Sequence, residues 1–153
     1  MRNSKNVKGF TLIELIVVIA IIGVLAAILV PSMIGYVGQS KLSTANSNAK
    51  LAFTNAATYC TNCEVAGTPC TTSVSNVDLT GGTAGGPYDK DGAHLTEALQ
   101  SLMGGTSNAG VATVNITAEG APSSSAWAKT AGDNYVGGYP DEAEAKTSES
   151  KGV

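Results

Sequence analysis

The chain has 153 residues and a formal charge of −3, from nine basic and twelve acidic side chains. This length is enough for one small domain beside an apolar segment. The acidic balance, without clustered Lys and Arg, argues against a nucleic-acid-binding surface. A single histidine, and no nucleophile beside a plausible base, leave no catalytic residue, metal or cofactor to assign. We therefore do not expect an enzyme.

The first predicted element is an apolar helix that follows a basic N-terminal end. The run from Phe10 to Val30 has 21 residues, and as a helix it spans about 31 Å, enough for a bilayer core. Arg2, Lys5 and Lys8 precede it without an acidic residue. By the positive-inside rule, we expect this end to stay in the cytoplasm and the rest of the chain to be exported.

Glu14 distinguishes this helix from a plain membrane anchor. It is the only charged side chain in the apolar run, and a charge at membrane depth costs roughly 2.5–3.5 kcal/mol on insertion scales. Such residues are usually functional, so we expect a partner to neutralise Glu14. A secretory signal peptide is one competing interpretation, but the run is long and no Ala-x-Ala cleavage site follows it. A plain anchor is another, but it explains neither Glu14 nor the Gly9-Phe10 pair.

The residues around Glu14 resemble the N-terminus of a type IV pilin. The resemblance covers the apolar run as far as Pro31 and begins with the segment Lys8-Gly9-Phe10-Thr11-Leu12-Ile13-Glu14-Leu15. It implies that a prepilin peptidase cuts after Gly9 and that the new N-terminal residue, Phe10, is methylated. It also implies that the helix is kept, first in the membrane and then in the core of a filament.

The resemblance further implies an assembly role for Phe10 and Glu14. Cleavage places an α-ammonium on Phe10, near a helix N-terminus whose dipole favours a carboxylate. The ammonium of one subunit can pair with Glu14 of its neighbour, and a subunit at the wrong height leaves both charges poorly solvated. Neutralisation by lipid head groups, or protonation of Glu14, is the alternative. Gly23 and Pro31 match a glycine and a proline of the family, and we expect them to kink, interrupt or loosen the helix.

Beyond Pro31 the pattern predicts an amphipathic continuation of the same helix over residues 31–60. Its apolar side chains recur at three- and four-residue steps on one narrow face. They are Leu42, Ala45, Ala49, Ala52, Phe53, Ala56 and Cys60. Such a face needs a domain packed against it.

The expected organisation is a leader at 1–9, a membrane or filament-core helix at 10–30, the amphipathic half at 31–60, a globular head at 61–140 and a mobile acidic tail at 141–153.

The head is predicted to be α+β, with a small antiparallel sheet packed on the amphipathic helix. We expect a second helix over 93–103, stopped by Gly104-Gly105. Strands are predicted from the alternation of apolar residues and from flanking turn residues, at 73–79, 111–118, 125–130 and 135–139. The glycine-rich residues 81–87 and the acidic residues 89–92 are predicted to be turns rather than phosphate or calcium sites.

Three cysteines lie close together in the sequence, at Cys60, Cys63 and Cys70. An exported domain meets an oxidising compartment, so we expect one disulfide. A zinc site is less favoured because the only histidine, His94, is distant in the sequence. A bridge to Cys70 is favoured over Cys60–Cys63, because it pins the loop that leaves the helix. Which cysteine pairs with Cys70 stays open, and one thiol is left over.

Three functional hypotheses follow. The first is a type IV pilin subunit, held in the cytoplasmic membrane by its helix and then polymerised into an extracellular pilus for adhesion, twitching motility or DNA uptake. Its partners would be other copies of the subunit, the prepilin peptidase and the assembly machinery in the membrane. The second is a pseudopilin of a type II secretion or competence system. The third is a minor pilin at the filament tip that binds a carbohydrate surface.

Overall fold

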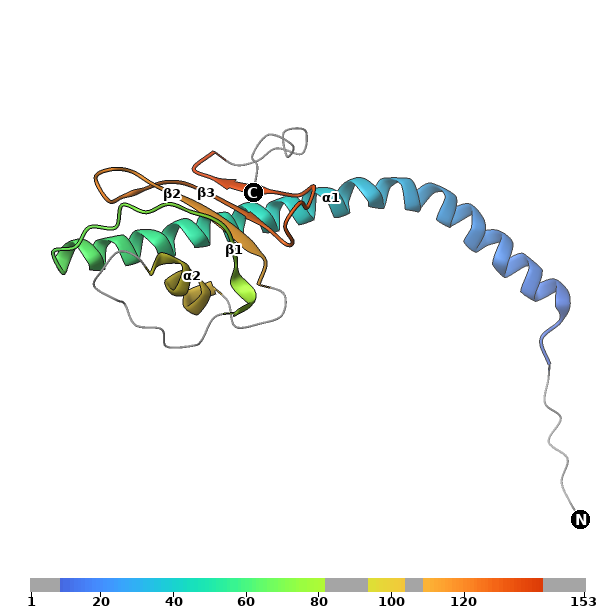
Figure 1. The fold of residues 1–153 in the computed structure, drawn as a ribbon. Helices are drawn as coiled ribbons and strands as arrows, with labels where there is room; N and C mark the ends of the chain where they lie inside the picture. The colour runs from blue at the N-terminus through green and yellow to red at the C-terminus, as the bar shows by residue number, and fades with distance from the viewer. Residues whose placement is uncertain (1–8, 82–93, 104–108, 142–153) are drawn as a thin grey trace, which may run out of the picture. The chain divides into compact units, whose positions relative to one another are not determined.

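The computed structural model describes residues 9–81, 94–103 and 109–141. The chain divides into two compact units, Met1–Val37 and Gly38–Val153, with the boundary inside the first helix. We describe each unit separately, and from here on we call the second unit, which includes the α1 residues from Gly38 onward, the head. The elements in chain order are α1 (Leu12–Val65), β1 (Val74–Asp78), the short 3-10 helix η1 (Leu79–Gly81), α2 (Leu95–Met103), β2 (Val111–Ile116), β3 (Pro122–Ala128) and β4 (Gly137–Tyr139), as Figure 1 shows.

In the first unit, α1 passes through both Gly23 and Pro31 without interruption. Proline removes only one backbone hydrogen bond, and the flanking turns keep theirs. The hydroxyl of Ser32 also donates a 2.9 Å hydrogen bond to the carbonyl of Leu29. The expected interruption therefore does not occur in this conformation. The loosening expected when a subunit enters a filament stays a prediction.

The second unit contains a four-stranded antiparallel sheet in the order β1-β2-β3-β4. The predicted α+β class is confirmed, with shifted strand ends. β3 begins at Pro122 rather than at residue 125, and β4 is shorter than predicted. Proline is tolerated as the first residue of a strand, because its missing N–H costs little there. The turn between β2 and β3 closes through a 2.8 Å bond from Thr117 N to Ala121 O.

Helix α1 ends at Val65, five residues beyond the expected end at Cys60. The end has the two hydrogen bonds of a Schellman motif. Thr68 N donates to Cys63 O and Gly67 N donates to Glu64 O, each at 3.0 Å. Gly67 has a φ of 82°, a left-handed conformation that glycine adopts without steric cost. Consequently Cys63 lies on the helix rather than in the following loop.

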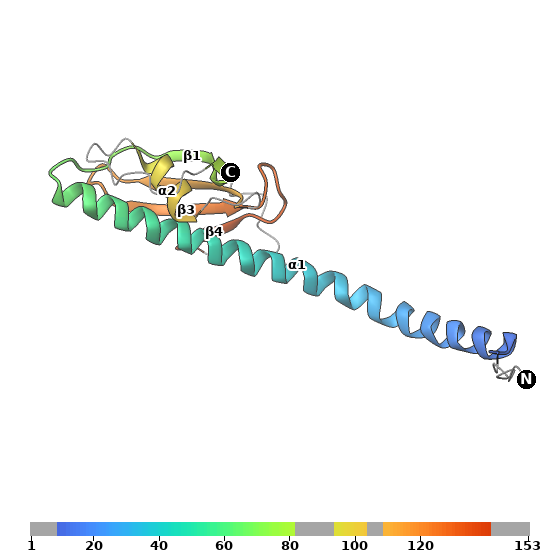
Figure 2. The same cartoon turned by 90° about the horizontal axis from the view of Figure 1, so that it is seen from below.

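The core lies between one face of the sheet and the two helices, α1 and α2 (Figures 1 and 2). The predicted narrow apolar face of α1 is confirmed, since all its members are buried except the half-buried Phe53. Alanines let the sheet approach closely. A Cβ added to Gly137 of β4 would lie 2.0 Å from the backbone carbon of Ala45, and the Ser125 hydroxyl donates a 2.7 Å bond to Ala49 O.

Helix α2 begins at Leu95, two residues later than predicted, and buries Leu95, Ala98 and Leu99. Its predicted stop at Gly104-Gly105 lies outside the described residues. So do the turns predicted at 82–87 and 89–92 and the tail at 142–153.

Candidate functional site

Thr11 and Glu14 form a reciprocal cap at the start of α1. Thr11 N and Thr11 Oγ1 donate hydrogen bonds to Glu14 Oε2 at 2.8 and 2.5 Å, and Glu14 N donates to Thr11 Oγ1 at 3.4 Å. This is a capping box, in which a Thr at the N-cap and a Glu three residues later satisfy each other's backbone N–H groups. The role predicted for Glu14 did not include this cap, although the Thr-x-x-Glu spacing before an apolar run is the known signal of a capping box.

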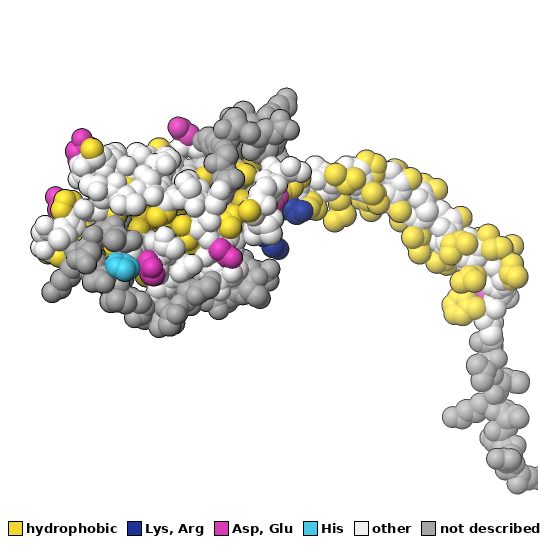
Figure 3. Space-filling model, in the orientation of Figure 1, with side chains coloured by type: hydrophobic (Ala, Val, Ile, Leu, Met, Phe, Trp, Pro, Cys, Tyr) yellow, Lys and Arg dark blue, Asp and Glu magenta, His cyan; other side chains and the backbone are white. Residues whose placement is uncertain are grey.

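The helical surface that follows this cap is apolar and exposed. Side chains of Leu12 through Tyr36 are all exposed within the structure, and α1 is long and apolar enough to cross a membrane. Figure 3 shows hydrophobic side chains along the visible face of this segment. Soluble monomers rarely leave a contiguous apolar surface of this extent uncovered. The first unit therefore requires lipid or other helices around it.

Gly9 and Phe10, the predicted processing residues, precede α1 and are exposed. The side chain of Phe10 is 88% exposed. The space around Gly9 is open, since no atom lies within 4 Å of the position that a Cβ would take there. The geometry thus leaves the bond after Gly9 accessible to an enzyme in this conformation.

The three cysteines come together at the C-terminal end of α1. All three are buried thiols, so the predicted disulfide is not formed in this structure. The Cys60 thiol lies within hydrogen-bonding reach of Cys70, and the Cys63 thiol lies within reach of the Tyr59 hydroxyl. Burial, and then the neighbouring Cys70, raise the pKa of the Cys60 thiol to about 12. A thiol with so high a pKa is a weak nucleophile at neutral pH.

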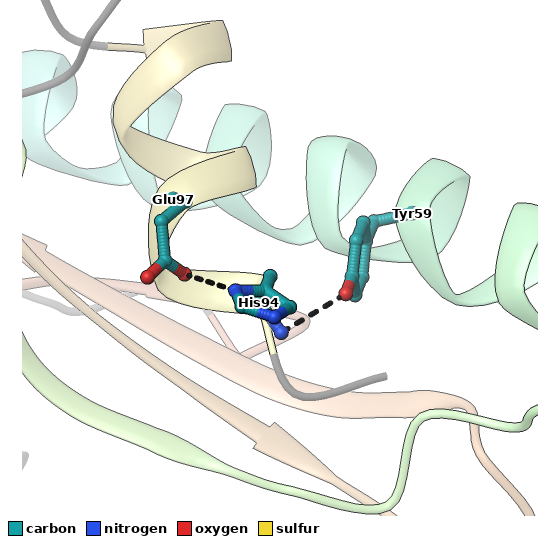
Figure 4. Close-up of polar contacts among 3 residues, drawn as sticks. All are labelled: Tyr59, His94 and Glu97. Atoms are coloured by element: carbon teal, nitrogen blue, oxygen red, sulfur yellow. Dashed lines mark hydrogen bonds and ion pairs between the residues drawn. The ribbon is translucent and has the colours of Figure 1, made fainter. Parts of the chain in front are cut away.

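Tyr59 connects this cluster to α2. Its hydroxyl accepts a 3.1 Å hydrogen bond from the backbone N–H of His94, as Figure 4 shows. Burial, and then the contact with Cys63, raises the pKa of the Tyr59 phenol above its usual range. The His94 ring itself faces Glu97, with Nδ1 and Oε2 3.6 Å apart. Within the described parts of the chain, no group of His, Cys, Asp or Glu is arranged to hold a metal ion.

Comparison with known proteins matches the N-terminal part of the chain. A family model described as "Prokaryotic N-terminal methylation motif" matches residues 4–30. The chain is 52% identical to the "Type IV major pilin protein PilA" of Myxococcus xanthus over 52 residues, which are 34% of this chain and 23% of that protein. It is 58% identical to the "Type IV major fimbrial protein FimA" of Dichelobacter nodosus over 36 residues, 24% of this chain and 23% of that protein.

A longer match is with the "Type IV major alpha-pilin" of Moraxella bovis. It is 40% identical over 75 residues, which are 48% of this chain and 47% of that protein. The chain thus spans between about a quarter and a half of the length of these relatives. The comparison with solved structures gives no match.

Proposed function

Because the N-terminal segment of this chain is that of a type IV pilin, we propose that the protein is a filament subunit that polymerises through its N-terminal helix. Leader removal after Gly9 leaves a mature chain of 144 residues (153 − 9) that begins at a methylated Phe10. Before assembly, the helix holds the subunit in the cytoplasmic membrane, with the N-terminus inside and the head outside. Type IV pilins are structural proteins, and we assign no enzymatic activity or cofactor.

The observation that carries this proposal is the exposed apolar surface of α1 with one acid at its start. The side chains from Leu12 to Tyr36 are exposed, and Glu14 is the only charged side chain among them. Lipid tails cover this surface in the precursor, and the same surface of neighbouring copies covers it in the filament. When helix–helix contacts replace helix–lipid contacts, the apolar side chains stay buried. The axial register between neighbouring subunits is therefore decided by close packing and by polar pairs.

Glu14 has the capacity for two roles at once. The bonds from Thr11 go to Oε2, whereas a carboxylate offers about four acceptor sites on its two oxygens. Oε1 can therefore accept a hydrogen bond from the α-ammonium of Phe10 on a neighbouring copy. In a poorly solvated filament core, each charge without the other is costly. The pair then fixes the axial height at which an incoming subunit stops.

Two variants separate the charge of Glu14 from its capping role. Glu14→Gln keeps a side-chain oxygen for Thr11 but removes the charge, whereas Thr11→Ala removes the capping hydroxyl and keeps the charge. We expect Glu14→Gln to insert in the membrane and lose its leader normally while sedimentable filaments fall about tenfold or more. Thr11→Ala should stay close to the unmodified chain. Normal filament yield in Glu14→Gln, or equal losses in the two variants, would contradict the pairing role.

We also propose that the filament serves adhesion, twitching motility or DNA uptake. Each of these three roles would act through the assembled filament, so all three should fail together when Glu14→Gln replaces the unmodified chain. The measurement is surface attachment, colony spreading and transformation frequency in the same strains. A defect in one of the three with normal filaments would place the role in the head rather than in assembly.

A further inference from the structure

The head carries opposite charges at its two ends. At the end near Gly38, the ammonium groups of Lys41 and Lys129 are exposed and line one groove. At the other end, Glu64 lies in the last turn of α1, and Glu119 lies in the turn between β2 and β3. Figure 3 shows Lys side chains near one end of the head, and acidic side chains both at the opposite end and along the visible face between the two ends.

Backbone geometry places Glu119 at the same end of the head as Glu64, far from the two lysines. A Cβ on Gly120, beside Glu119, would lie 3.2 Å from Pro69, in the loop that follows α1. Lys41 and Glu64 are 23 residues apart on α1, about 35 Å at 1.5 Å per residue. One chain therefore cannot bring its own Glu64 to the groove while α1 is intact.

The groove between Lys41 and Lys129 also offers an aromatic surface. It has a volume of about 270 Å³, and the side chains of Trp127 and Tyr135 contribute an aromatic wall. The ammonium of Lys41 lies 5.3 Å from the centre of the Tyr135 ring, in cation–π contact. Asp133 also lines the groove, so Lys129 is needed for a net positive charge there. Lys129 also lines a second pocket together with Asp78, whose carboxylate offsets part of this positive charge. Beside Glu64, at the other end of the head, the Val65 side chain is 86% exposed.

We propose that the Glu64–Val65 corner of one copy docks in the Lys41–Lys129 groove of the next copy along the filament. The proposal rests on the proposed polymerisation. Open filaments grow by heterologous contacts, in which two different surfaces of the same chain meet. The corner offers a carboxylate and an apolar side chain, and the groove offers ammonium groups and an aromatic wall. A contact between the same end of two copies would instead place acidic side chains against acidic ones, or lysines against lysines.

Charge reversal provides the first test. We expect Glu64→Lys and Lys129→Glu each to lower filament yield about tenfold, because an attraction becomes a repulsion at every contact along the filament. The double variant, with the charges exchanged, should recover to within about twofold of the unmodified chain. Glu97→Lys and Lys50→Glu are charge-reversal controls, since neither side chain lines the groove or belongs to the corner; Glu97 pairs with His94 and Lys50 lies over the Tyr139 ring, so the melting temperature of each control variant is measured beside its yield. Single variants with normal yield, or a double variant without recovery, would overturn the proposal.

Zero-length coupling of purified filaments provides the second test. A carbodiimide joins a carboxylate directly to an amine, with loss of water and no spacer. We expect an isopeptide between Glu64 and Lys129 or Lys41, and it must join two copies because one chain cannot span the distance. Couplings only between other pairs would overturn the docking but leave polymerisation intact. Failure of the proposed function would look different, because the unmodified chain would then form no filaments at all.

Discussion

The hydroxyl of Ser125 lies 2.7 Å from the carbonyl oxygen of Ala49 and joins β3 to α1 inside the head. Ser125 is only 5% exposed, so water cannot easily replace this bond. A buried hydrogen bond of this kind contributes about 1 kcal/mol, and an acceptor left without its donor costs a similar amount.

Ser125→Ala should therefore lower the free energy of unfolding of the head by about 1 kcal/mol. Ser75→Ala is a suitable control, because Ser75 is exposed on β1. Denaturant unfolding followed by the fluorescence of Trp127, which lies in the core cluster, reports on this region. Equal midpoints for Ser125→Ala and the unmodified chain would show that the Ser125 bond does not hold β3 on α1.

The thiol cluster leads to a specific disulfide prediction. Cys60 and Cys70 are in mutual hydrogen-bonding reach, whereas Cys63 contacts Tyr59. We expect oxidation in the exported chain to join Cys60 to Cys70 and leave Cys63 as a thiol. Closing so short a loop stabilises the head by about 2–3 kcal/mol.

Proteolysis after Glu64 separates Cys60 and Cys63 from Cys70, so a bridge to Cys70 keeps the two peptides together until reduction. Cys63→Ser should retain this linked pair, and Cys60→Ser should lose it. A linked pair that survives in Cys60→Ser would instead assign the bridge to Cys63. A peptide with Cys60 joined to Cys63 would contradict the prediction altogether.

Asp78 predicts a pH dependence of head stability. Its carboxylate accepts bonds from the Thr80 hydroxyl at 2.6 Å and from Thr80 N at 2.9 Å, and these hold the pKa of Asp78 below its usual value. A lowered pKa means that the folded state favours the ionised carboxylate. This stabilisation is present above the ordinary Asp pKa, about 3.9, and is lost as the pH falls through the lower folded value.

We therefore expect the melting temperature of the unmodified chain to fall more steeply than that of Asp78→Asn between about pH 5 and pH 2, a range that includes the ordinary Asp pKa. Thr80→Ala removes the hydroxyl donor and should flatten the curve partly. Parallel curves for the unmodified chain and Asp78→Asn would show that Asp78 titrates alike in the folded and unfolded states.

Periodicity explains which parts of the fold could be predicted. The alanine face of α1 and the existence of four strands follow from apolar spacing. The end of α1 could not be placed from apolar spacing, because Gly67 ends the helix through a backbone conformation rather than through hydrophobicity. The packing of β4 on α1 could not be predicted either, because Gly137 lies directly on Ala45, a residue far from it in the sequence. Such contacts depend on tertiary packing, which a single sequence does not reveal.

At the start of α1, the sequence identified Glu14 as a candidate site residue by its charge, but it did not predict the hydrogen bonds that Glu14 makes. Glu14 is conspicuous as the one acid in an apolar run, but its bonds to Thr11 give the same side chain a local purpose. For the cysteines, the sequence predicted one disulfide to Cys70 and one remaining thiol, and it left the partner of Cys70 open. Their division between a Cys60–Cys70 contact and a Cys63–Tyr59 contact depends on the extra helical turn to Val65. Tyr59 itself gave no signal, because one tyrosine on a mixed helix face resembles ordinary core.

The most direct test is the mass of the N-terminal peptide from purified filaments. The account predicts a chain that begins at Phe10, carries one methyl group on its α-nitrogen and keeps Glu14 and the whole apolar helix. Filaments that contain chains beginning at Met1, or chains that have lost the helix, would contradict it.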